Sequence, residues 1–507
     1  MILLGVGLSI LIVLAIGLAV SRKVEGDSGR YLVAGRTLGL PLVAAGLMAQ
    51  AVDSNATLGN TDLAYGFGFW AGASLPIGLA LCLVLTGIFF AKPMNAAKLL
   101  TLPDWYARRY GRQVEVSSSV LMVVAYVVLL AGNLVAGGFL FEHFLGIDYS
   151  IGVLLIVAVV LTYTVAGGMF ADAYTAAAQM AITVVATAAL FAWVALTHGI
   201  SVPEGMGAFD FEQLTSTAGG APINWATLIA LGVGDIVAID FMQRIFAAKS
   251  PQVARRACFL GAAGTLLIGI PFTYVALSAV DIVGADGGEA VLFTLLEDHA
   301  PTGLAMAVLA AIVAASCSTA NGAILGTGAV VARNIAGIRD TDNGRLPGLK
   351  IFGAGKDPLL RASRWAMFPI VILSVVMAVR VPQTGILLTL AFDLMLAGLA
   401  VPFIVGHYWR RGGAVAALAA IAVGTGVRLV LFAVTPTIYG APNDLLYFAN
   451  DVVTPAFDGW PTFIAVASGL AAYAVAALVR PARAALTAPA SVPIQAQPEK
   501  VPVGAED

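Results

Sequence analysis

Long uncharged blocks of apolar residues constrain this chain more than any other feature of its sequence. A block of about 20 such residues is what an α-helix needs to cross the hydrocarbon core of a bilayer. Charged residues make up only 11% of the 507 residues, against about 25% in an average soluble domain. We therefore expect an all-α integral membrane protein whose surroundings are lipid. The net charge of −2 gives no footprint for nucleic-acid binding.

The apolar blocks predict thirteen transmembrane helices. They cover residues 2–20, 40–60, 68–91, 118–141, 149–168, 174–198, 224–242, 257–283, 302–333, 364–382, 385–407, 412–435 and 460–479. The first block lacks a basic start and a small-residue cleavage site, and Arg22 and Lys23 follow it directly. We interpret it, residues 1–20, as an uncleaved peripheral helix rather than a signal peptide.

The distribution of basic residues orients these helices. If the N-terminus is outside and the C-terminus is cytoplasmic, all 27 Lys and Arg residues except Arg380 and Arg428 fall on the cytoplasmic side, Arg244 among them. This is the positive-inside bias, and a wrong number of spans would destroy it. The pattern favours a multi-pass protein of the cell (inner) membrane. The tail 480–507 is rich in Pro and Ala without periodicity, which predicts a disordered cytoplasmic segment.

Two of the predicted spans carry polar or glycine-rich interruptions. The second contains the polar run 49–57, and the seventh contains Gly232, Gly234 and Asp235. Paired breaks in corresponding positions of two halves indicate a binding site at the membrane midplane. A kink packed against neighbouring helices is the simpler alternative for either span alone.

The spacing of the two breaks predicts the domain organisation. They lie five spans apart, so these spans cross in opposite directions, as two inverted five-helix repeats require. We expect a transporter core at 40–407, with repeats at about 40–198 and 224–407, followed by two peripheral helices within 412–479.

Four short motifs occur in order along these spans. They are YLVAGR at 31–36, YTVAGG at 163–168 with Thr175 and Gln179, QR at 243–244 with AAKS at 247–250, and ASCST at 315–319. In these motifs the chain resembles the sodium/solute symporter family, which includes proline, pantothenate and sodium/glucose cotransporters. The resemblance covers about residues 2–435. It implies a leucine-transporter-like fold and sodium-coupled symport of a small organic solute by alternating access, with no enzymatic activity and no cofactor besides the coupling ion.

The resemblance also implies a sodium site made of Ala49, Val52, Ala315, Ser318 and Thr319. Ser318 and Thr319 place two hydroxyls in an apolar block, and Ala315 lies on the face of Ser318. Ala49 and Val52 would end a half-helix, where the last carbonyls have no intrahelical partner.

Two alternatives to this site stay open. A register shifted by two would use Ala51 and Ser54. Hydroxyls that bond back to their own helix are the plainer interpretation of Ser318 and Thr319.

One position departs from the family pattern. Ala176 stands where the family has Asp after Thr175, which argues against a second sodium ion. Asp172 lies one helical turn away on the same face and is the candidate to replace that acid in the ion path.

Ionisable and amide groups at membrane depth are the candidates for solute binding. They are Gln50, Asp53, Asn55, Asp235 and Asp393. In the family that this chain resembles, the sugar transporters carry a Glu beside an aromatic residue on the third span. Residues 67–70 hold no acid here, which argues against a sugar, whereas an amino acid, amine, amide or carboxylate stays open.

Tyr65 and Trp70 are candidates for gating, although aromatic residues near span ends are more often interface anchors. Proton coupling through Asp53 and a membrane sensor of the same fold are the alternative functions. The oligomeric state is left open, with a monomer as one option.

Overall fold

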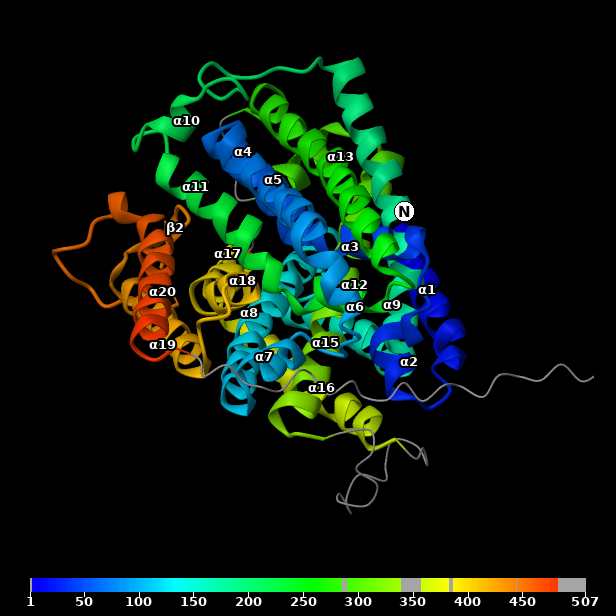
Figure 1. Ribbon diagram of the computed structural model, residues 1–507. Coiled ribbons are helices and arrows are strands. Elements are labelled where there is room, and N and C mark those ends of the chain that lie inside the picture. Colours follow the sequence, from blue (N-terminus) through cyan, green and yellow to red (C-terminus); the bar gives the residue numbers. More distant parts are fainter. Residues whose placement is uncertain (1, 285–289, 339–356, 383–385, 444, 482–507) are drawn as a thin grey trace, which may run out of the picture.

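Helices make up most of this protein in the computed structural model (Figure 1). The structure describes the chain except residues 1, 285–289, 339–356, 383–385, 444 and 482–507. All but the first two residues of the predicted tail lie outside the described residues. Six of the basic residues used to orient the chain lie outside them: Arg339, Arg345, Lys350, Lys356, Arg483 and Lys500.

The α-helices follow the apolar blocks. In the first half they are α1 (Ile2–Val20), α2 (Ser28–Val33), α3 (Leu40–Ala51), α4 (Asn60–Phe67), α5 (Phe69–Leu85), α6 (Ala91–Ala96), α7 (Pro103–Tyr110), α8 (Arg112–Leu145) and α9 (Tyr149–Thr197). In the second half they are α10 (Glu212–Thr215), α11 (Ala221–Ile229), α12 (Ile239–Ala247), α13 (Pro251–Val283), α14 (Val291–Thr294), α15 (Thr302–Val330), α16 (Pro358–Arg380), α17 (Ile386–Met395), α18 (Val401–Tyr408), α19 (Ala414–Val434) and α20 (Trp460–Val479).

Short 3-10 and π segments join or extend these helices. They are η1 (Ser21–Val24), η2 (Ala34–Arg36), η3 (Asn55–Gly59), η4 (Thr86–Phe90), η5 (Ala230–Gly234), η6 (Asp235–Val237), η7 (Leu295–His299), η8 (Val331–Ile335), η9 (Leu396–Ala400) and η10 (Pro455–Phe457). A small antiparallel hairpin of β1 (Thr437–Ile438) and β2 (Ala441–Pro442) follows α19.

Ten helices in the described part of the chain are long and apolar enough to cross a membrane. The number is eleven if the bent pair Ala221–Val237 and Ile239–Ala247 forms one span. The α3 helix is apolar but shorter than these. The protein is therefore a helical, multi-pass membrane protein, as its composition indicates.

A break in the chain follows α3. Val52 leaves the helical region with φ −109° and ψ 80°, and η3 then leads into α4. The Thr57 hydroxyl donates to the carbonyls of Asp53 and Ser54, both at 3.1 Å. Such local side-chain bonds compete with the helix ladder, which is why a polar run interrupts an apolar helix here.

A second break separates α11 from α12. The chain passes through η5 and η6, takes an extended conformation at Ala238 (φ −66°, ψ 128°), and resumes at an angle of 46°. A Cβ atom at Gly234 would lie 2.5 Å from the Phe392 carbonyl oxygen. The glycine is therefore required for the close approach of this break to α17.

The long helix α9 contains a third irregularity at Gly168. This residue has φ 51° and ψ −136°, inside a helix that otherwise runs from Tyr149 to Thr197. A Cβ atom there would overlap the carbonyl oxygen of Tyr31 in α2. The two spans predicted at 149–168 and 174–198 thus meet at this glycine in one kinked element.

The α15 helix forms the centre of the packing. It contacts α9, α8, α16, α1 and α3, and nearly all of its residues from Val308 to Val330 are buried. In contrast, α19 and α20 pack mainly on each other and on η9, at one edge of the molecule (Figure 1). This arrangement brings the end of α3 against the middle of α15.

Candidate functional site

The end of α3 meets two hydroxyl groups of α15. Ser318 Oγ donates to the Ala49 carbonyl at 3.0 Å, and Thr319 Oγ1 donates to the same oxygen at 3.2 Å. Ser318 Oγ also donates to the Ala315 carbonyl at 2.7 Å, a bond back to its own helix that shares the one hydroxyl hydrogen with the bond to Ala49. All four residues are fully buried. The cluster therefore gathers hydroxyl and carbonyl oxygens of two helices at one point.

The break after α3 explains why the Ala49 carbonyl is available. Val52 N donates to the Met48 carbonyl at 2.8 Å as the helix ends. Ala49 belongs to the last turn, whose carbonyls lack intrahelical partners and carry the negative end of the helix dipole. Val52 is buried and begins the non-helical segment. Such an end favours a cation.

Gln50 lies against α15 at the same level. Its Nε2 donates to the Ser318 carbonyl at 2.8 Å, and its Oε1 is buried without a hydrogen-bond partner in the described structure. The contact needs Gly322, because a Cβ atom there would overlap the Gln50 side chain. Gln50 therefore ties the broken helix to the hydroxyl-bearing turn.

Asp172 of α9 belongs to a buried network beside this cluster. Its Oδ1 forms an ion pair with Arg244 Nη2 and accepts from Asn321 Nδ2 at 3.0 Å. Asn321 Oδ1 accepts in turn from Thr164 Oγ1 at 2.6 Å. Asn321 is two residues after Thr319, so the network adjoins the hydroxyl pair along α15. Asp172 was predicted as an ion-path residue, but its pairing with Arg244 and Asn321 was not predicted.

The position of Arg244 differs from the sequence expectation. The charge pattern placed Arg244 in a cytoplasmic loop, but it lies on α12 and its side chain is only 1% exposed. Besides pairing with Asp172, it donates from Nη1 to the Asp240 carbonyl at 2.8 Å. A guanidinium inside an apolar bundle needs such partners, because an unpaired buried charge is very costly. The QR motif was the only sequence signal for it.

Carboxylates gather at the second break. Asp235 begins η6 and is 1% exposed, and Asp240 lies in the first turn of α12, beyond the extended Ala238. Asp240 Oδ1 accepts from the Tyr126 hydroxyl at 2.6 Å and from Phe241 N at 2.7 Å. Asp235 lies within electrostatic range of Asp240 and of Asp53 at the first break. Asp53 is likewise buried, whereas the side chain of Asn55 is outside the described part of the structure.

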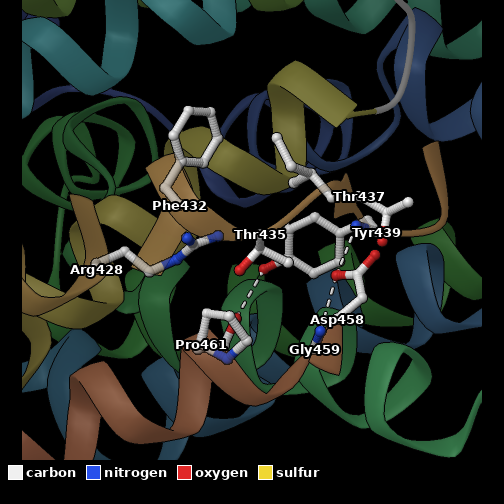
Figure 2. A pocket seen from close by; sticks show the side chains of 10 residues that line it. Arg428, Phe432, Thr435, Thr437, Tyr439, Asp458, Gly459 and Pro461 are labelled. Atoms are coloured by element: carbon white, nitrogen blue, oxygen red, sulfur yellow. Dashed lines mark hydrogen bonds between the residues drawn. The ribbon is translucent and has the colours of Figure 1, made fainter. Parts of the chain in front are cut away.

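The structure does not bring Asp393 into this group. Its carboxylate forms an ion pair with Arg428 of α19 and accepts from Thr462 Oγ1 of α20 at 3.0 Å. Beside this pair lies a cavity of about 10 Å³, lined by Arg428, Thr435, Tyr439, Asp458 and Thr462 among others (Figure 2). That volume suffices for about one water molecule. Asp393 therefore links α17 to α19 and α20.

Tyr65 and Trp70 lie at an end of the bundle. The Tyr65 hydroxyl donates to the Gly284 carbonyl, and Trp70 Nε1 donates to the Ala208 carbonyl at 3.0 Å. Between them, Gly68 has φ 98° and lies against Gln213. These contacts tie α4 and α5 to the segments that follow α13 and α9.

The known proteins that are similar to this chain are transporters. The model of the Sodium:solute symporter family matches residues 31–424. The high affinity choline transporter 1 of Homo sapiens is 25% identical over 62% of this chain and 57% of its own length. The osmoregulated proline transporter OpuE of Bacillus subtilis is 26% identical over 85% of this chain and 88% of its own length.

Two solved structures share the fold. A Na+-coupled sialic acid symporter in a substrate-bound outward-open state has a TM-score of 0.74 at 16% identity, covering 94% of this chain and 97% of that chain. A nucleobase-cation-symport-1 family transporter in a closed conformation has a TM-score of 0.53 at 14% identity, covering 89% and 93%.

Proposed function

Because the chain belongs to the sodium:solute symporter family, we propose that it is a secondary transporter that couples movement of a small organic solute to that of sodium. The observation that carries the proposal is the convergence of Ser318 and Thr319 on the Ala49 carbonyl, at a helix break inside an apolar bundle. Buried hydroxyls and end-of-helix carbonyls are neutral oxygen ligands, which suit a weakly held alkali cation.

The proposed ion site uses five residues. The hydroxyls of Ser318 and Thr319 and the carbonyls of Ala49, Val52 and Ala315 would supply its oxygens. Hydrogen-bond distances of 3.2 Å or less join Ser318 Oγ to the carbonyls of Ala49 and Ala315, and Thr319 Oγ1 to the carbonyl of Ala49. Rotation of the two hydroxyl hydrogens would turn the same oxygens towards an ion.

The ion and the solute would bind to the same state and strengthen each other by linkage. Each sodium ion that crosses carries one charge, which contributes about 2.3 kcal/mol per 100 mV of membrane potential. The gradient would thereby drive solute uphill when the loaded site turns inward.

We extend the proposal to thirteen spans in two inverted repeats. At 49 residues, α9 would be about 74 Å long as a straight helix, more than twice a hydrocarbon core of about 30 Å. It therefore forms two spans about Gly168. If α3 with α4 and α11 with α12 each form one broken span, the repeats fall at about 40–198 and 224–407. The N-terminus would then be outside.

The proposed inner path of the ion passes Asp172. Its pairing with Arg244 and Asn321 lies beside the hydroxyl pair, so opening this network would give the ion polar partners along α15. Tyr65 and Trp70 tie helix ends to connecting segments, and we assign them to gating. Gln50, Asp53 and Asp235 border the two breaks and are assigned to the solute, whereas Asp393 is assigned to packing.

Reconstitution tests the proposal. Proteoliposomes with an inward sodium gradient are screened with choline, proline and glucose, the solutes named in relatives. Sodium-dependent accumulation of one solute is expected, whereas uptake driven equally by a proton gradient without sodium would favour the proton alternative.

A double substitution locates the ion. Ser318→Ala with Thr319→Ala is expected to weaken sodium activation of uptake by roughly tenfold or more, since two ligands are lost. Ser117→Ala with Thr162→Ala is the matched control, because these hydroxyls are exposed and bond only to their own helices. Unchanged sodium dependence in the first pair would remove the proposed site.

A further inference from the structure

Asp235 carries a buried carboxylate that the proposed ion site does not use. Its side chain is 1% exposed, and neither of its oxygens has a hydrogen-bond partner in the described structure. Burial of an ionised carboxylate without a partner costs several kcal/mol or more. A residue in this position is stable as an ion only when something positive comes to it.

No residue in the described part of the chain supplies that positive charge. Arg244, the fully buried cation near the breaks among the described residues, is committed to Asp172 and to the Asp240 carbonyl. The charged groups that interact electrostatically with Asp235 are Asp240 and Asp53, and both are carboxylates. Asp240 is already stabilised by Tyr126 and by Phe241 N. Asp235 is therefore the carboxylate left for an outside partner.

Resting on the proposed function, we propose that the transported solute is a small organic cation whose ammonium group binds at Asp235. A zwitterion fits less well, because its own carboxylate would enter a region that already holds Asp53 and Asp240. Like charges in a low-dielectric interior repel strongly. In the described residues, no three acidic, His or Cys side chains are placed to hold a metal ion.

The surroundings of Asp235 suit an alkylammonium group. Tyr126 and Cys82 lie within its electrostatic range, which places an aromatic residue and a thiol near this carboxylate. An ammonium group with alkyl substituents is favoured by aromatic faces. The two helix breaks bring Asp53 and Asp235 to the same region from opposite halves of the chain, so the solute would touch both halves.

Ligand chemistry tests this inference. Choline is compared with dimethylbutanol, its uncharged carbon analogue, and with proline, in sodium-dependent binding to the purified full chain. We expect choline to bind and its neutral analogue to bind roughly tenfold more weakly or worse. If proline or the neutral analogue binds in a sodium-dependent way and choline does not bind, the proposal of an organic cation is wrong. The proposal of sodium-coupled symport is not affected by that result.

Substitution tests the residue. Asp235→Asn is expected to lower choline affinity roughly tenfold or more, whereas Asp235→Glu retains part of it. Asp298→Asn is the matched control, because that acid is exposed. Stabilisation by sodium alone, measured by thermal unfolding, should persist in Asp235→Asn and shows that the variant is folded.

Three further results would overturn the inference. Unchanged choline affinity in Asp235→Asn removes the residue from the solute site. Loss of only the pH dependence of uptake in that variant makes Asp235 a proton site. Absence of any sodium effect, in stabilisation as well as in uptake, overturns the proposed function itself and is thereby distinguishable from the first two outcomes.

Discussion

The ion pair between Asp172 and Arg244 gives a prediction whose size follows from burial. Both side chains are 1% exposed. Removing one partner of a buried pair leaves an uncompensated charge, at a cost of about 3–5 kcal/mol. Arg244→Met also loses the bond to the Asp240 carbonyl, worth about 1 kcal/mol. We therefore expect Arg244→Met to lower the free energy of unfolding by about 4–6 kcal/mol.

A double-mutant cycle isolates the pair. Asp172→Asn leaves Arg244 charged and should cost about 3 kcal/mol or more, whereas the double variant buries no unpaired charge from this couple. The decrease in the free energy of unfolding of the double variant should be smaller than the sum of the two single decreases by about 1–3 kcal/mol. Denaturant titration in mixed detergent micelles measures these free energies of unfolding.

An exposed ion pair serves as the control for this cycle. Arg30 and Glu25 are 2.9 Å apart with side chains 38% and 63% exposed, so their coupling should stay below about 1 kcal/mol. If the losses at Asp172 and Arg244 simply add, or if Arg244→Met costs no more than Arg30→Met, the buried network does not stabilise the bundle as argued.

Two further predictions concern the kink and the ion count. Gly168→Ala forces a side chain into φ 51° against the Tyr31 carbonyl, so the yield of monodisperse protein on size-exclusion chromatography should fall. Gly303→Ala, which adds a Cβ in open space, should leave the yield unchanged, and equal profiles for the two variants would contradict the argument. Because Ala176 supplies no carboxylate beside Thr175, sodium activation of uptake should show a Hill coefficient of about 1; a value of about 2 would reject the single-ion proposal.

The sequence alone determined the class of protein and the position of its breaks. A helix in lipid has to satisfy its backbone hydrogen bonds within its own segment. The length of an apolar block and the residues that break a helix therefore predict where a span begins and ends. The end of α3 at Ala51 and the break around Asp235 are examples. The hydroxyl pair at Ser318 and Thr319 could also be predicted from the sequence, because both residues lie in one short motif.

Only the tertiary structure decided which partner each buried charge has. Arg244 and Asp172 are 72 residues apart, and Asp393 meets Arg428 rather than the other candidate acids. A charge on one helix indicates that a partner is needed, but the choice of partner depends on which helix faces pack together. That packing is fixed by glycines such as Gly168, Gly234 and Gly322, where one backbone comes close to another segment. The contribution of each ion pair to stability therefore depends on how the helices pack, and it cannot be derived from the sequence of one segment.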